Sequence, residues 1–133
     1  MGTVKTQATK FDLKALGRAL KESPAWHAKK RNSAVLFKGT QAHVYLMAMH
    51  AATRIPDHST PCAVNIHVLQ GRVRIVTKDG AIVLAGDGLV ALEAGTQYGL
   101  ASEKESLFVL EFFPLTSKHT FSGEQDDYFD NWV

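Results

Sequence analysis

The sequence has little of what marks secreted, membrane-spanning or nucleic-acid-binding proteins. Its single cysteine, Cys62, cannot form an intrachain disulfide, which favours a reducing compartment. No apolar run approaches the roughly 18 residues of a membrane span, and no segment follows the plan of a signal peptide. The net charge of only +2 is far below the basic excess of a nucleic-acid-binding protein. We therefore expect a cytoplasmic protein with no nucleic-acid or membrane partner.

What the sequence does have is an ordinary globular composition. The 133 residues are 45% apolar and 21% charged, which excludes wholesale disorder. A chain of this length fits one compact domain that buries roughly two thirds of its unfolded surface.

Charge is distributed unevenly between the two ends of the chain. Residues 1–38 carry nine Lys and Arg against two acidic residues, a net charge of +7, whereas residues 111–133 have a net charge of −4. Either both ends are simply solvated, or the acidic tail docks on the basic N-terminal segment of its own or a partner subunit. In the second case the apolar anchors are Tyr128, Phe129 and Trp132.

Apolar periodicity divides the chain into one helix and a series of strands. Leu13, Leu16 and Leu20 recur at helical spacing after Asp12, a good N-cap, which predicts a helix over 13–22. Ser23 and Pro24 end it, because a proline disfavours helical geometry in the residue before it. Eight runs with strand-like patterns follow: 34–37, 42–50, 63–70, 72–77, 81–84, 89–92, 97–101 and 106–113.

Turn residues separate these runs, and together they predict an all-β sandwich or barrel. Asp79-Gly80 is a hairpin signal because both residues tolerate the positive φ angles of a tight turn. Short strands at this spacing are typical of jelly rolls and barrels. We expect an N-terminal extension over 1–32, a barrel over 33–115 and an acidic aromatic tail over 116–133, all in one globular domain.

Two glycine-containing segments resemble the motifs of the cupin family. The first family motif is a glycine, five residues, His-x-His, three or four residues, Glu, six residues and a glycine. Gly71 closes this motif, and the family's first glycine, its two His and its Glu fall on Ala52, His58, Thr60 and Val64.

The second cupin motif is a glycine, five residues, Pro-x-Gly, two residues and His. It is similar to residues 86–98, where Gly95 is kept and the family's first glycine, Pro and His fall on Asp87, Glu93 and Tyr98. The resemblance covers roughly residues 33–115 and implies a double-stranded β-helix, the jelly-roll barrel of small single-domain bacterial cupins, with one short N-terminal helix.

The resemblance also implies a metal centre, of which this sequence keeps little. Cupins normally present three His and one carboxylate, and only His58 is retained here. An altered set of His58, Cys62 and Tyr98 could hold a divalent transition ion, although the Tyr98 phenol would have to ionise from a reference pKa of about 10. The alternative is that no metal binds.

The same residues outline a candidate ligand pocket inside the barrel. It comprises His58, Thr60, Cys62, Val64, Ile66, Tyr98 and Phe108. Alternation in the run 63–70 points Val64 inward and His67 outward. The same alternation places Leu46 and Val109 inside the barrel. His43 and His50 lie near the ends of one strand and are expected to be solvated or capping residues rather than ligands.

Three functions are compatible with this sequence. The first is a non-catalytic cupin that binds a small molecule in the barrel and has largely lost the metal centre. The second is a metal-dependent cupin enzyme, of oxygenase, isomerase or lyase type, with an altered ligand set. The third is a structural dimerisation module. The resemblance implies a homodimer, for which the strand face holding Asn65 and His67 is a candidate contact.

Deletion of residues 122–133 tests the docking of the acidic tail. If the tail docks, the deletion lowers the melting temperature or weakens subunit association, measured by calorimetry and analytical ultracentrifugation. If neither quantity changes, the tail is solvated and the docking hypothesis is wrong.

Overall fold

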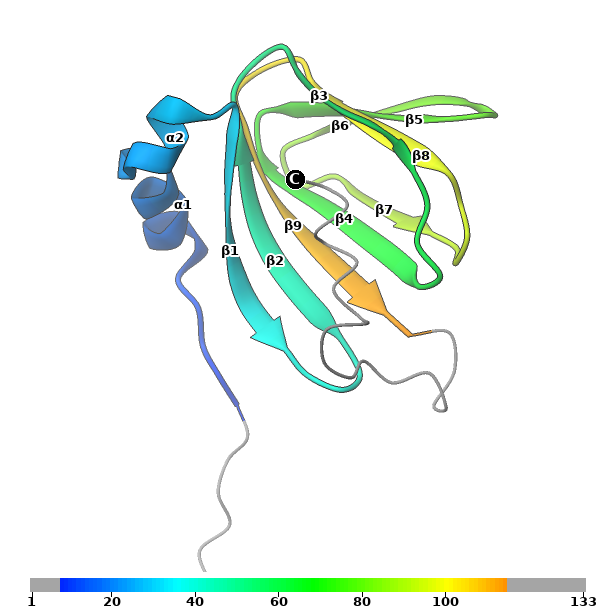
Figure 1. Ribbon diagram of the computed structural model, residues 1–133, viewed down its shortest axis with the longest axis horizontal. Helices are drawn as coiled ribbons and strands as arrows, with labels where there is room; N and C mark the ends of the chain where they lie inside the picture. The colour runs from blue at the N-terminus through cyan, green and yellow to red at the C-terminus, as the bar shows by residue number, and fades with distance from the viewer. Residues whose placement is uncertain (1–7, 115–133) are drawn as a thin grey trace, which may run out of the picture.

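A computed structural model describes residues 8–114 of the chain. In this range the chain forms two helices followed by nine strands (Figure 1). In chain order they are α1 (Leu13–Glu22), α2 (Pro24–Ala28), β1 (Arg31–Lys38), β2 (His43–Met49), β3 (Thr53–His58), β4 (Ala63–Gln70), β5 (Arg72–Thr77), β6 (Gly80–Ala85), β7 (Leu89–Leu92), β8 (Tyr98–Ser102) and β9 (Ser106–Phe113).

The strands form two antiparallel sheets that face each other. One sheet has the order β1-β2-β9-β4-β7 and the other the order β3-β8-β5-β6. Figure 1 shows the two sheets curving around a common interior, with the helices outside. This is the predicted jelly-roll barrel with a short N-terminal helix.

The main core fills the space between the sheets. Its largest side chains are Tyr45, Tyr98, Phe108 and Phe112, each at most 1% exposed. In β4 the residues Val64, Ile66 and Val68 alternate with half-buried neighbours, so His67 lies on the outer face, as predicted.

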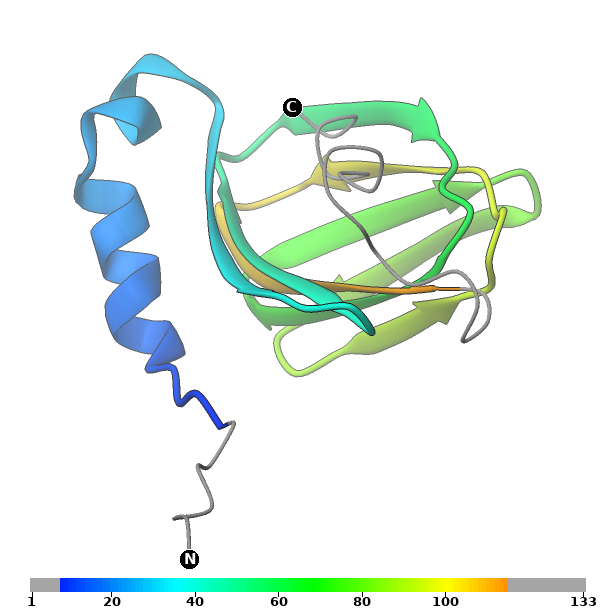
Figure 2. The same cartoon turned by 60° about the horizontal axis from the view of Figure 1, so that its bottom comes forward.

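The helices form a second, outer core on the five-stranded sheet (Figure 2). Leu20 of α1 and Trp26 of α2 pack with Leu46, Ala48, Leu107 and Val109. Gly17 allows the close approach, because a Cβ there would lie 2.7 Å from Leu107 Cδ2.

Local chemistry explains where the helices begin. Asp12 caps α1 by accepting a hydrogen bond from the Ala15 N–H at 3.1 Å. The predicted helix over 13–22 is confirmed. Helix α2 was not predicted: Pro24 ends α1 but also starts α2, because its fixed φ suits the first turn of a helix.

Two strand predictions were wrong. Strand β3 was missed because Pro56 interrupts it and is usually a sign against a strand. Leu46 and Val109 face the helices rather than the barrel interior. Both faces of β2 and β9 are largely buried, so apolar residues occupy most positions on both faces and alternation no longer reveals the inner face.

The histidines of β2 and the turn after it are less solvated than predicted. His43 is only 3% exposed. His50 is half-buried, stacks on Trp26 with ring centroids 3.6 Å apart, and its Nε2 lies 2.8 Å from the Trp26 carbonyl oxygen. His50 therefore links the end of β2 to α2.

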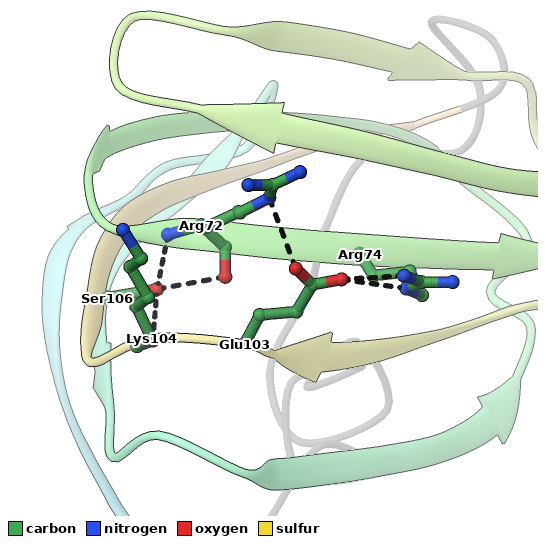
Figure 3. A network of polar contacts seen from close by, with 5 residues as sticks. All are labelled: Arg72, Arg74, Glu103, Lys104 and Ser106. Carbon is green, nitrogen blue, oxygen red and sulfur yellow. Dashed lines mark hydrogen bonds and ion pairs between the residues drawn. The ribbon is translucent and has the colours of Figure 1, made fainter.

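A polar network fixes the turn between β8 and β9 against β5 (Figure 3). Glu103 pairs with Arg74 at 2.7 Å and with Arg72 at 3.1 Å, and the hydrogen bond from Arg74 is the main cause that lowers the pKa of Glu103. The Ser106 hydroxyl accepts from the Arg72 N–H at 3.0 Å and donates to the Lys104 carbonyl at 2.7 Å. The ion pairs are exposed to solvent and add little stability. The hydrogen bonds of the Ser106 hydroxyl are partly buried, so they hold the turn more effectively.

Candidate functional site

The two ring-bearing residues of the predicted metal-ligand set meet at one end of the barrel. His58 is the last residue of β3 and pairs in register with Tyr98, the first residue of β8. Their ring centroids are 4.7 Å apart, and His58 Nδ1 lies 3.0 Å from the Pro56 carbonyl oxygen. Strand pairing therefore brings these two side chains together.

Thr60 and Cys62 lie in the loop that follows β3 and are bonded to each other. The Thr60 hydroxyl donates to the Cys62 carbonyl at 3.2 Å, and the Cys62 thiol donates to Thr60 Oγ1 at 3.5 Å. Burial raises the pKa of Cys62 above its ordinary value, although its hydrogen bonds act in the opposite direction. Burial also raises the pKa of Tyr98 strongly, and the neighbouring Cys62 charge raises it further. Both groups are protonated at neutral pH.

The remaining predicted pocket residues are packed in the barrel core. Val64, Ile66 and Phe108 belong to the same buried cluster as Cys62 and Tyr98. Of the seven predicted residues, His58 is half-buried and each of the other six is at most 3% exposed. The structure thus brings the predicted residues together in and beside the buried core of the barrel, and their role as a ligand pocket stays a prediction.

A cleft that was not predicted opens between β1 and β3, and we call it the β1–β3 cleft. Its volume is about 860 Å³. It is lined by Ala25, Lys29, Lys30, Arg31, Asn32, Ser33, Met47, Ala52, Thr53 and Arg54. Four of these residues are basic. The available signal in the sequence was the run of three basic residues at 29–31, where the first strand begins.

The sheet topology explains why this cleft exists. Strands β1 and β3 are the outermost strands of their respective sheets, and they are not paired with each other. The space between the two edges leads from the surface to Met47 and Thr53, which are buried on the inner side. The cleft therefore reaches the barrel interior from its side.

A second cleft, which we call the β7 cleft, has a different charge. Its volume is about 790 Å³, and its lining includes Asp57, Lys78, Asp79 and Glu93 together with residues of β7. Three carboxylates against one ammonium make it acidic, whereas the β1–β3 cleft is basic.

The predicted dimer contact lies on the outer face of the five-stranded sheet. Asn65 and His67 of β4 are half-buried, and His67 is paired with Leu89 of β7, which is 59% exposed. An apolar side chain this exposed beside polar ones is compatible with an interface. The homodimer and its contact stay predictions, as does docking of the tail, which falls outside residues 8–114.

Solved structures share this architecture at low sequence identity. A cupin superfamily protein from Desulfitobacterium hafniense matches with a TM-score of 0.62 and 14% identity, over 65% of this chain and 79% of that one. KdgF from a Halomonas species matches with a TM-score of 0.61 and 12% identity, over 67% and 84%. The chain has the cupin fold.

The match to a cupin enzyme extends over only part of that protein. A variant of salicylate 1,2-dioxygenase from Pseudoaminobacter salicylatoxidans matches with a TM-score of 0.68 and 10% identity. The match covers 77% of this chain but only 34% of the dioxygenase chain. No protein-family model matches the chain, and no curated protein matches it in sequence. In addition, no helix within residues 8–114 is long and apolar enough to cross a membrane. Similarity at this level shows the cupin fold and assigns no reaction.

The backbone keeps the cupin motif even where the residues have changed. All four positions that match family glycines have left-handed φ angles: Ala52 at 60°, Gly71 at 91°, Asp87 at 68° and Gly95 at 81°. Within the described range, Ala52 and Asp87 are the two residues other than glycine with positive φ. The resemblance found in the sequence is therefore a resemblance of turn geometry.

The cupin metal position is not matched by a suitable set of ligands. Nowhere in residues 8–114 do three or more His, Cys, Asp or Glu side chains form a group that could hold a metal ion. Of the predicted set, Cys62 and Tyr98 have raised pKa values in an apolar environment, which disfavours the anionic forms that bind metals. Thr60 and Val64 replace a histidine and a carboxylate. These residues do not fit a divalent ion.

Substitutions at the motif glycines test the turn geometry. We expect Ala52→Gly to raise the free energy of unfolding by about 1 kcal/mol, because it relieves a side chain in the left-handed region. Asp87→Gly should raise it less, since Asp tolerates this region better. Urea denaturation measures both. A lower free energy of unfolding for the Ala52→Gly variant would contradict the left-handed conformation of Ala52 in this turn.

Two further variants are controls that separate backbone strain from steric overlap. Gly95→Ala places a Cβ in open space and should cost only the backbone strain, about 1 kcal/mol. Gly71→Ala also forces a Cβ against Ser106 and the Glu105 carbonyl, so it should cost more, roughly 2–4 kcal/mol.

Metal analysis tests the conclusion about the ligand set. We expect protein purified without chelator, and then incubated with Mn, Fe, Ni, Cu or Zn, to retain far less than about one metal ion per chain by mass spectrometry. His58→Ala should leave the metal content unchanged. A stoichiometric metal that is lost in this variant would overturn the conclusion and favour a metal-dependent enzyme.

Proposed function

We propose that this cupin-fold protein is a non-catalytic binder of a small organic molecule, which it holds in the β1–β3 cleft without a resident metal ion. The proposal differs from the barrel-interior pocket expected from the sequence. The observation that carries it is the cleft itself, with its volume of about 860 Å³. Pockets for small ligands usually measure about 300–1,000 Å³.

The wall of the cleft combines the surface types that small-molecule sites need. Met47 belongs to the barrel core and provides an apolar floor. Ser33 of β1 and Thr53 of β3 provide hydroxyl groups. A few polar groups around an apolar floor fix a ligand's orientation while burial supplies binding free energy.

Hydrogen bonds to α1 hold the β1 wall in place. Asn32 Nδ2 donates to the Leu20 carbonyl at 3.0 Å and to Ser23 Oγ at 2.8 Å, and Asn32 Oδ1 accepts from the Ser33 N–H at 3.0 Å. A wall that is already ordered reduces the entropy lost on binding. The cleft is therefore preorganised on this side.

The chemistry at the end of the barrel gives less support to the enzyme alternative. An oxygenase, isomerase or lyase of cupin type depends on a metal held by several ionised or imidazole ligands. Here the protonated Cys62 and Tyr98 stand beside a single histidine, His58. The binding function requires none of these groups to ionise.

Filling the β1–β3 cleft tests the proposed function. Ser33→Trp places a large side chain at the half-buried cleft wall, and Thr96→Trp does the same in the β7 cleft as a matched control. The probes are a panel of small organic acids, amides, sugars and nucleosides, measured by thermal shift and native mass spectrometry. We expect at least one probe to bind the wild type and the Thr96→Trp variant, and Ser33→Trp to abolish this binding.

Two results would contradict the proposed function. One is that no probe binds the wild type. The other is that bound probes are retained fully by Ser33→Trp, which would place their site elsewhere. Circular dichroism of both tryptophan variants checks that each remains folded.

A further inference from the structure

We infer that the molecule bound in the β1–β3 cleft is an organic anion, whose carboxylate or phosphate group is held between Arg31 and Thr53. This inference rests on the proposed function and names the class of ligand. It is carried by three independent features: the charge of the lining, the position of Arg31 and the hydroxyl of Thr53.

The lining of the cleft is basic and has no internal neutralisation. Lys29, Lys30, Arg31 and Arg54 all line it, with no acidic residue among the lining side chains of the described chain. The ion pairs found within residues 8–114 use other cations, namely Lys21, Arg72 and Arg74. Four cations around one concave space attract and retain an anion.

Arg31 is the cation placed deepest in this arrangement. In the register of β1 and β2, Arg31 lies opposite Met49 and Ser33 lies opposite Met47. Both methionines face the barrel core, so Arg31 and Ser33 share the inner face of β1. Arg31 is half-buried, and burial lowers its pKa because it disfavours the charged form. An anion beside the guanidinium would offset that desolvation.

Thr53 supplies a hydrogen-bonding group on the opposite wall. The residue is only 4% exposed, and its backbone N–H donates to Ser102 Oγ at 3.2 Å. The hydroxyl itself has no hydrogen-bond partner among the described residues. A buried hydroxyl without a partner costs free energy. Less than 1 Å² of this oxygen is exposed, so a ligand oxygen accepts its proton by displacing the side chains that cover it.

The β1–β3 cleft and the β7 cleft differ in the charge of their lining residues, so the effect of charge on binding can be compared within one molecule. The β7 cleft is similar in volume but has three carboxylates and one ammonium, which repel an anion. If size alone decided what binds, both clefts would take the same ligands. Charge therefore predicts that anions select the β1–β3 cleft.

Matched pairs of anionic and neutral probes test the inference on the whole chain of residues 1–133. The pairs are benzoate with benzamide and phenyl phosphate with phenol, titrated by calorimetry in low-salt buffer. We expect at least one anion to bind at least tenfold more tightly than its neutral partner, and more weakly as salt rises. The two anions show whether the cleft favours a carboxylate or a phosphate.

Single substitutions then locate the site. Arg31→Gln should weaken anion binding about tenfold or more, whereas Lys78→Gln in the β7 cleft should leave it unchanged. Thr53→Val keeps the side-chain shape and removes the hydroxyl. We expect it to weaken binding several-fold without lowering the melting temperature, because the hydroxyl has no partner to lose.

The outcomes separate this inference from the proposed function. If neutral and anionic probes bind equally and Ser33→Trp blocks both, the cleft binds small molecules but the inference is wrong. If no small probe binds, both are wrong. If small anions do not bind but a synthetic peptide of residues 122–133 binds and depends on Arg31, the cleft receives the acidic tail and the inference is again wrong.

Discussion

Burial of β9 on both faces is the constraint on which the rest of the structure depends. Its inward residues, Phe108, Leu110 and Phe112, fill the barrel, while Leu107 and Val109 pack beneath the helices. Because β9 also lies between β2 and β4, it joins the inner core, the outer core and the five-stranded sheet. The helices therefore complete the hydrophobic packing of a strand that would otherwise expose apolar residues to water. The cleft, in turn, follows from where this sheet ends at β1.

Much of the fold could be predicted from the sequence because its signals are local. The spacing of Leu13, Leu16 and Leu20 defines α1, and the two motifs define turns whose left-handed geometry persists at Ala52 and Asp87 without glycine. The inner face of β2 and β9 could not be predicted, since strands buried on both sides show no alternation. The β1–β3 cleft could not be predicted either, because it is made by two edges whose separation depends on the closure of the whole barrel.

The candidate site shows that fold and chemistry are encoded separately in this chain. The backbone retains the turns that in cupins present metal ligands, whereas Thr60, Val64 and Tyr98 stand at three of the four ligand positions. Burial of Cys62 and Tyr98 changes these groups from candidate ligands into neutral packing residues with hydrogen-bonding capacity. A resemblance in fold therefore predicts where the chain turns, whereas the side chains at the site determine which ligands can bind.

The hydrogen bond from Asn32 to the last turn of α1 has a consequence for local dynamics. The Leu20 carbonyl would lose this partner if α1 separated from the sheet, and the cleft wall would lose its anchor in the same event. Fraying of the helix and widening of the cleft are therefore a single cooperative opening rather than two independent motions. A molecule that binds the closed cleft would slow amide exchange in α1, at the outer surface of the barrel, although it touches no residue of that helix.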